Sequence, residues 1–432
     1  MDPGLLIVLR GHNPWLADPP RQAELLAEQL PDPFVPRRAA LELRAGSAEL
    51  IVGPRQAGKS TWLREALSGR KEPVLVLHAD EPRIRELCRS PAQALHALAG
   101  VLTERTILVF EELQRLEDAA LFLKGVVDLQ PRRKIAATGS SSFQLRARTR
   151  ESLAGRARRT LLLPFSLEEL AARLPAGRPA AVHDDEQRDL WERLVVVGGY
   201  PRAWLAAEPE QELHRLVEAF ILRDASDLHA IERPGAFRRL LELAAADAGN
   251  LVNLSSWAAV AAVSRDTAAR YLDLAQEAHL LRLVPPFASG KRAEITGAPK
   301  VFFLDNGLRN VLVGGFEASG RRADRGALWE NAVFTELAKR LRLLDGIFHW
   351  RTRNKAEVDF VVRRGDRILG IEVTAGPLDR PRLSRSARSF IDAVRPARFG
   401  VINAALRDDA TVDGVPVLFR RPWELGDLLT ER

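Results

Sequence analysis

The chain has 432 residues, which is too long for one ordinary domain, so two or three domains are expected. Hydrophobic residues make up 46% and charged residues 28%, the balance of a soluble globular protein. The formal net charge of +7 is compatible with a nucleic-acid partner, and equally with the arginine and alanine usage of a GC-rich genome.

Cysteine usage and the lengths of the apolar runs indicate the cellular compartment. The one cysteine, Cys88, excludes an intrachain disulfide and a cysteine metal cluster, and suits a reducing compartment. The apolar run of residues 5–9 lacks the basic start and small-residue cleavage site of a signal peptide. No apolar stretch approaches the roughly 18 residues of a membrane span. We therefore expect a cytoplasmic protein without a membrane partner.

In chain order, residues 1–34 form a proline-rich arm that we expect to pack on the next domain. Residues 35–165 alternate short apolar runs with helical patterns. The runs are residues 48–52, 75–77, 107–110, 135–138 and 160–163. Buried strands separated by helices indicate an α/β fold with a parallel sheet covered on both faces.

A phosphate-binding loop follows the first of these strands. It matches the pattern G-x-x-x-x-G-K-[ST], with a helical segment after it. Its residues are Gly53, Pro54, Arg55, Gln56, Ala57, Gly58, Lys59 and Ser60, and Thr61 follows. The glycines let backbone N–H groups surround phosphate oxygens at a helix N-terminus. We expect Lys59 to reach the β- and γ-phosphates of ATP and Ser60 to hold Mg²⁺; the alternative is a chance glycine loop.

Acidic and polar residues end the next two strands. Glu111 and Glu112 follow the strand of residues 107–110, which places carboxylates beside the phosphate loop. We expect Glu111 to act through Mg²⁺ and Glu112 to polarise the attacking water; the alternative is a solvated acidic loop. Thr138 ends the fourth strand and is expected to sense the γ-phosphate or position water, unless the segment is a plain turn. Arg156 is a candidate for stabilising charge on a neighbouring subunit's nucleotide; a solvated arginine is the alternative.

The rest of the chain divides into four segments. Residues 166–245 are mostly helical and are expected to form a lid of the ATPase domain. Residues 246–290 follow a helix–turn–helix–strand pattern typical of a winged helix, residues 291–325 are expected to be a linker with one strand, and residues 326–432 a second αβ domain. Arg265 and Arg270 on one helix could contact a DNA groove, whereas winged helices also serve as packing modules.

The ordered motifs resemble AAA-type ATPases, specifically a prokaryotic group whose C-terminal half is a domain of unknown function. The resemblance extends from about residue 35 to 420. The matching segments are residues 53–60, Glu111-Glu112-Leu113-Gln114, Thr138-Gly139-Ser140-Ser141, Ser152-Leu153-Ala154-Gly155-Arg156, Gly198-Gly199-Tyr200-Pro201, Arg223-Asp224, Asp305-Asn306-Gly307-Leu308 and Glu330-Asn331. Glu111 stands where that group has aspartate, and its longer side chain predicts slow turnover. The resemblance implies ATP and Mg²⁺ as cofactors and a homo-oligomer, for example a hexamer.

The last segment resembles the PD-(D/E)XK nuclease core. Glu330 lies on a helix, and Asp359 and Glu372 lie on adjacent strands, where they would form a second metal site. Thr374 stands at the position of the usual lysine. Three readings stay open: a catalytically inactive DNA-binding or scaffold domain, an active nuclease, and a structural αβ domain.

Together these features predict an ATP-hydrolysing, DNA-binding motor or remodelling factor with a degenerate nuclease-like domain. Two alternatives remain. The first is an ATP-controlled switch that binds a protein partner, and the second is an ATP-gated nuclease.

Overall fold

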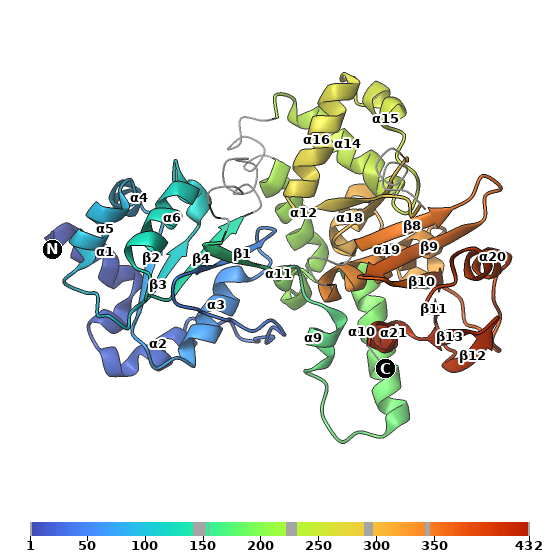
Figure 1. The fold of residues 1–432 in the computed structure, drawn as a ribbon, viewed down its shortest axis with the longest axis horizontal. Coiled ribbons are helices and arrows are strands. Elements are labelled where there is room, and N and C mark those ends of the chain that lie inside the picture. Colours follow the sequence, from blue (N-terminus) through green and yellow to red (C-terminus); the bar gives the residue numbers. More distant parts are fainter. Residues whose placement is uncertain are drawn as a thin grey trace. The chain divides into compact units, whose positions relative to one another are not determined.

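A computed structural model describes residues 2–140, 153, 155–221, 231–288, 297–341 and 346–430. The chain divides into two compact units (Figure 1). The first holds Met1–Pro164 and Glu277–His279, and the second holds Phe165–Gln276 and Leu280–Arg432. Within the described ranges, no helix is long and apolar enough to cross a membrane.

The first unit is built on a five-stranded parallel sheet of order β2-β3-β4-β1-β5. Its strands are β1 (Ala48–Gly53), β2 (Val74–His78), β3 (Ile107–Glu111), β4 (Ile135–Ser140) and β5 (Ala157–Leu161). Its helices of six or more residues are α1 (Pro3–His12), α2 (Gln22–Ala27), α3 (Lys59–Ser68), α4 (Pro82–Leu87), α5 (Pro91–Leu98) and α6 (Ala119–Leu129). The predicted parallel α/β architecture is confirmed.

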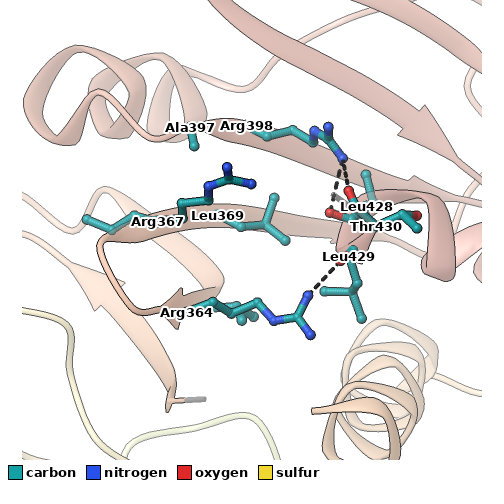
Figure 2. Close-up of a pocket in the computed structure, with 10 residues that line it drawn as sticks. Arg364, Arg367, Leu369, Ala397, Arg398, Leu428, Leu429 and Thr430 are labelled. Carbon is teal, nitrogen blue, oxygen red and sulfur yellow. Dashed lines mark hydrogen bonds between the residues drawn. The ribbon is translucent and has the colours of Figure 1, made fainter. Parts of the chain in front are cut away.

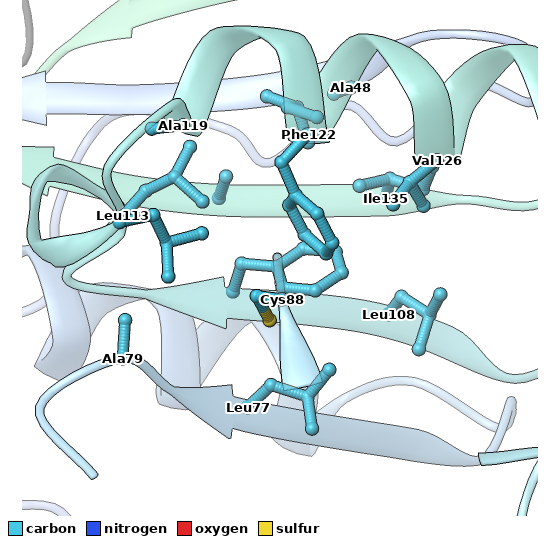
Figure 3. Close-up of a cluster of buried hydrophobic side chains, with 14 of the residues drawn as sticks. Ala48, Leu77, Ala79, Cys88, Leu108, Leu113, Ala119, Phe122, Val126 and Ile135 are labelled. Carbon is cyan, nitrogen blue, oxygen red and sulfur yellow. The ribbon is translucent and has the colours of Figure 1, made fainter. Parts of the chain in front are cut away.

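Alternate residues of the central strands enter two separate apolar cores, as expected for a sheet buried on both faces. Leu50 and Val52 of β1 join the core beneath α6, which also contains Phe122, Val126 and Leu108 (Figure 3). Ile51 joins the other core, which also holds Trp62. Cys88 is buried in the first of these cores, which raises the pKa of its thiol to about 12.

The N-terminal arm covers the edge of this sheet. Asn13 pairs with both backbone groups of Val76: its Nδ2 donates to the carbonyl at 2.9 Å and its Oδ1 accepts from the N–H at 2.6 Å. Trp15 Nε1 donates to the carbonyl of Val74 at 2.7 Å, and Gln22 Oε1 accepts from its N–H at 2.8 Å. Since β2 is an edge strand, these side chains occupy the positions that another strand would take.

The second unit begins with helices. They are α9 (Leu167–Ala171), α10 (Ala180–Val197), α11 (Pro201–Leu205), α12 (Pro209–Ala219), α14 (Pro234–Ala246), α15 (Leu254–Val260), α16 (Arg265–Glu277), α18 (Asn306–Val313) and α19 (Arg325–Arg340). The helices expected as a lid of the ATPase domain belong to this unit, where α10 packs on α18 and α19. Trp191 and Trp329 meet edge to face at 5.4 Å between α10 and α19.

Residues 297–325 are not a linker, contrary to our expectation for residues 291–325. They contain strand β7 (Lys300–Phe303), which pairs antiparallel with β6 (Leu281–Val284), and the buried helix α18. Glycine and charge in this segment suggested a linker, but the polar side chain of Asn306 is buried and binds backbone carbonyls. Asn306 Nδ2 donates to Val195 O and Leu328 O, both at 3.0 Å. Residues 291–296 lie outside the described ranges.

The same network explains several of the matching motifs. Asp305 accepts a 2.7 Å hydrogen bond from the N–H of Gly199, and a Cβ on Gly198 would lie 2.1 Å from its carboxylate. Asn331 Nδ2 donates to Asn306 Oδ1 at 2.7 Å. These residues therefore join α10, α18 and α19. The Arg223-Asp224 motif lies outside the described residues.

Three helices, α14, α15 and α16, precede the β6–β7 ribbon, in the order expected for a winged helix. Ser264 Oγ accepts from Thr267 N at 3.0 Å and so caps α16. A winged helix stays a prediction.

The C-terminal part is a six-stranded mixed sheet of order β12-β13-β11-β10-β9-β8. Its elements are β8 (Gly346–Arg351), β9 (Glu357–Arg364), β10 (Arg367–Thr374), α20 (Arg385–Val394), β11 (Arg398–Asn403), β12 (Asp408–Val412), β13 (Val415–Arg420) and α21 (Leu425–Leu429). α19 packs on it through Phe334 and Phe360, and α20 through Phe390 and Trp350. The nuclease-like assignment of this domain stays a prediction.

Candidate nucleotide-binding site and a second ionic cluster

The phosphate loop has a backbone that requires its glycines. Gly53 has φ of 153°, and a Cβ there would lie 2.0 Å from the carbonyl oxygen of Leu162. Gly58 has φ of 88°, also a conformation that L residues rarely adopt. Helix α3 begins at the next residue, Lys59, so its free N–H groups lie at the loop. A glycine loop followed by a helix N-terminus is an arrangement that can surround an anion with backbone N–H groups.

Lys59 lies across this loop. Its Nζ donates to the carbonyls of Gly53 at 3.0 Å and Pro54 at 2.9 Å, and its side chain is buried. These two acceptors are neutral. A phosphate would offer the ammonium group charged acceptors, which make stronger hydrogen bonds.

Glu111 ends β3 as a buried carboxylate, 1% exposed. Its Oε2 lies 3.2 Å from His78 Nε2 and 3.5 Å from Arg64 Nη2. Burial alone would raise the pKa of Glu111, but the contact with His78 and the charges of Arg64 and His78, with a hydrogen bond from Ser60, lower it. The same contact raises the pKa of His78. Glu111 is therefore an ionised group next to Ser60, as an oxygen ligand of Mg²⁺ must be.

The sequence did not identify His78 and Arg64 as neighbours of Glu111. His78 ends β2, which lies beside β3 in the sheet, and this register pairs His78 with Glu111. Arg64 follows Ser60 by one helical turn on α3. The rule that parallel strands end at one edge of a sheet could have pointed to His78.

Glu112 follows in a left-handed conformation, with φ of 56°. Its backbone N–H donates to Thr138 Oγ1 at 3.2 Å, and Gln114 Nε2 donates to its carboxylate. Thr138 is fully buried. The structure therefore brings together Glu111, Glu112 and Thr138 at the ends of β3 and β4.

Arg156 lies elsewhere in the unit. Its carbonyl accepts a 2.9 Å hydrogen bond from Ala48, the first residue of β1, whereas the phosphate loop follows the last. About 16 Å of strand separates these ends, at 3.3 Å per residue. Its Nε lies 2.6 Å from Asp128 Oδ1. Arg156 is thus distant from the phosphate loop of its own chain, and its action on a neighbouring subunit stays a prediction. Ser141, Ser152 and Ala154 lie outside the described residues.

The second unit contains an ionic cluster around Lys300. This side chain is 3% exposed, and its Nζ lies 3.1 Å from Glu330 Oε1 and 2.5 Å from Glu357 Oε1. Burial and the charge of Asp359 raise the pKa of Glu330 to about 8, and burial raises that of Asp359 to about 6. Three carboxyl groups, those of Glu330, Glu357 and Asp359, thus surround the single ammonium group of Lys300. Neither Lys300 nor Glu357 was identified from the sequence, since β7 joins this cluster only through tertiary packing.

The predicted second metal site is not formed as a three-ligand group. Asp359 Oδ2 accepts from Val373 N at 2.7 Å, and Glu372 Oε2 accepts from Ser384 Oγ at 3.1 Å. Glu330, the expected third ligand, is held by Lys300 instead. Across the described part of the chain, no three His, Cys, Asp or Glu side chains are grouped so that they could hold a metal ion.

Three family models match separate segments of the chain. A family described as an AAA domain matches residues 46–171. Two domains of unknown function, DUF8612 and DUF4143, match residues 188–319 and 325–419. A mutant of Thermotoga maritima RuvB is matched among solved structures at 18% identity, over 55% of this chain and 83% of that chain, with a TM-score of 0.27.

Several curated proteins are similar over most of their length. The uncharacterized protein Rv2008c of Mycobacterium tuberculosis is 31% identical over 362 residues, which cover 82% of this chain and 75% of that protein. An uncharacterized protein of Methanocaldococcus jannaschii, MJ1544, is 22% identical over 85% of this chain and 83% of its own length. The chain therefore belongs to the same family as the mycobacterial protein, and its residues 46–171, which contain the phosphate loop, match an AAA domain.

Proposed function

We propose that this protein binds ATP with Mg²⁺ and hydrolyses it at the phosphate loop. The observation that carries the proposal is the buried Glu111 carboxylate at the end of β3, in contact with Arg64 of the helix that begins at the phosphate loop. In this proposal Ser60 and Glu111 would hold Mg²⁺, and the backbone of Gly53–Thr61 would surround the phosphates. When bound, Mg²⁺ neutralises charge on the β- and γ-phosphate oxygens.

The chain's own residues then have distinct roles. Lys59 exchanges the carbonyls of Gly53 and Pro54 for phosphate oxygens. Glu112 accepts a proton from the attacking water, and Thr138 fixes the backbone that carries Glu112. The long side chain of Glu111, already in contact with His78 and Arg64, supports slow turnover.

Glu112→Gln separates binding from hydrolysis. This variant should bind ATP as the wild type does but turn it over ~10²–10⁴-fold more slowly, the usual contribution of a general base. Lys59→Ala should lose ATP binding itself. Nucleotide binding measured by calorimetry, alongside phosphate release, gives both quantities. Wild-type turnover in Glu112→Gln would overturn the assignment.

We further propose that the second unit engages DNA. The support is the net charge of +7 and the exposed Arg265 and Arg270 on the capped helix α16. ATPase rates should rise with duplex, forked or single-stranded DNA, and binding should weaken steeply with salt because counterions are released. If no form of DNA changes the rate or binds below micromolar concentrations, the ATP-controlled protein switch replaces the motor.

A second candidate function, an ATP-gated nuclease, is favoured by one observation. Lys300 supplies, from β7, the positive charge that Thr374 does not provide beside Asp359. The competing interpretation is that Lys300 neutralises the acids and leaves the domain inactive. We favour it because the ammonium group of Lys300 forms ion pairs with Glu330 and Glu357.

The two readings differ in the effect of divalent ions. An active nuclease cuts DNA with Mg²⁺ or Mn²⁺, and both Asp359→Ala and Lys300→Met abolish cutting. An inactive domain leaves DNA intact in the wild type at any ATP or metal concentration.

A further inference from the structure

A hollow of about 210 Å³ opens in the C-terminal sheet, away from the acids around Lys300 in sequence and strand position. Three arginines and an apolar floor line it. The lining residues are Val362, Arg364, Arg367, Ile368, Leu369, Ala397, Arg398, Leu428, Leu429 and Thr430. Three arginines thus line the hollow, with no carboxylate among its described lining residues.

Two of the arginines are held in place by the end of α21. Arg364 Nη1 donates to Leu429 O at 2.6 Å. Arg398 Nη1 donates to Asp427 O at 3.1 Å and Thr430 O at 3.2 Å. Figure 2 shows them reaching toward α21 from two strands, with Leu369 between them. Since these guanidinium groups are already ordered, a ligand that binds them has less side-chain entropy to overcome.

The third arginine, Arg367, begins β10 after the tight hairpin from β9. In the described part of the chain its guanidinium group has no hydrogen bond or ion pair, and it is exposed at the hollow. Its five N–H donors are therefore available to a ligand. Planar, forked donors of this kind match phosphate and carboxylate groups better than any other side chain.

The volume of the hollow and its apolar lining residues limit the kind of anion that it can bind. At about 210 Å³ it is below the roughly 300–1,000 Å³ of pockets for drug-sized ligands. A terminal phosphate that carries a small apolar or sugar portion fits this volume. Walls of Ile368, Leu369 and Leu428 lower the local dielectric, which strengthens the attraction between the arginines and a dianion.

We propose that this arginine hollow is a binding site for a phosphate dianion, either inorganic phosphate or a phosphate monoester. Free phosphate and the terminal phosphate of a DNA strand share this chemistry, and the second source rests on the proposed engagement of DNA. A strand end would be held by its terminal phosphate, with its first sugar on the apolar floor.

The experiment uses Lys59→Ala as background, so that the phosphate loop does not report binding. Affinity is measured for inorganic phosphate and for a short single strand with either a 5′-phosphate or a 5′-hydroxyl, at constant ionic strength. The key change is Arg367→Ala, which breaks no described contact and should leave the fold intact. Arg395→Ala is the matched control, since Arg395 is exposed in the same sheet domain but outside the hollow.

We expect Arg367→Ala to weaken phosphate binding at least tenfold and Arg395→Ala to leave it unchanged. If the protein prefers the 5′-phosphorylated strand and Arg367→Ala removes this preference, the ligand is the phosphate at a DNA strand end. If inorganic phosphate binds but the strand preference is absent, the ligand is free phosphate. The proposal is overturned if neither probe binds, or if Arg367→Ala and Arg395→Ala behave alike. DNA that fails to stimulate the ATPase while phosphate still binds would reject only the proposed DNA function.

Discussion

The hydroxyl of Thr138 accepts a 3.2 Å hydrogen bond from the backbone N–H of Glu112. This bond links β4 to the residue after β3 and holds Glu112 in its left-handed conformation, with φ of 56°. Thr138 thus positions the backbone of Glu112, the proposed base, and this role does not require contact with the nucleotide.

Thr138→Val should therefore slow turnover without changing ATP affinity. Valine keeps the buried shape but leaves the N–H of Glu112 without its acceptor, at a cost of ~1–3 kcal/mol. If that cost falls on the active conformation, kcat drops roughly tenfold or more. Thr138→Ser restores the acceptor and is the control; steady-state kinetics compare the two. A serine variant as slow as valine would contradict this role.

Stability of the second unit should depend on pH through Glu330. Its pKa rises from 4.5 to about 8 on folding, so between these values the folded state binds more protons than the unfolded state. The free energy of unfolding then decreases as pH rises from about 5 to 8. Denaturant titrations at pH 5, 6.5 and 8 measure the slope. Glu330→Gln, which remains neutral, should flatten it, whereas an unchanged slope would assign the effect to other groups.

Much of the architecture of the first unit could be predicted from the sequence. The phosphate loop is a local sequence pattern, and the carboxyl ends of parallel strands lie at one edge of their sheet. That logic placed Glu111 and Glu112 beside the loop. It could not find Lys300, whose partners Glu330 and Glu357 meet it only after α19 and β9 have packed.

The wrong linker assignment has a related cause. Burial of Asp305 and Asn306 is acceptable only because carbonyls and N–H groups of other helices meet their side chains, and no periodic pattern reveals such partners. Strand β12 was missed since Asp408 and Asp409, at its exposed start, favour a loop.

Asn306→Ala should destabilise the second unit strongly. Its amide nitrogen bonds the carbonyls of Val195 and Leu328, and its oxygen accepts from Asn331. Removing it deletes three buried hydrogen bonds, each worth ~0.5–1.5 kcal/mol, although Val195 O still accepts from Asn310 Nδ2 and Asn331 Nδ2 still donates to Phe303 O. Thermal unfolding should show a large fall in Tm for Asn306→Ala and almost none for Asn354→Ala, whose side chain is exposed. Equal effects would show that the network is solvated.

Asn13→Ala should expose the edge of the nucleotide-binding sheet. The amide of Asn13 satisfies both the N–H and the carbonyl of Val76, and it is completely buried. Loss of these bonds costs ~1–3 kcal/mol for each group left without water, and it frees the edge strand β2 to pair with a second chain. We expect a lower unfolding midpoint together with concentration-dependent association, measured by light scattering. His12→Ala, beside it on the same arm but exposed, is the control. Destabilisation without association would mean that Trp15 and Gln22 still protect the edge.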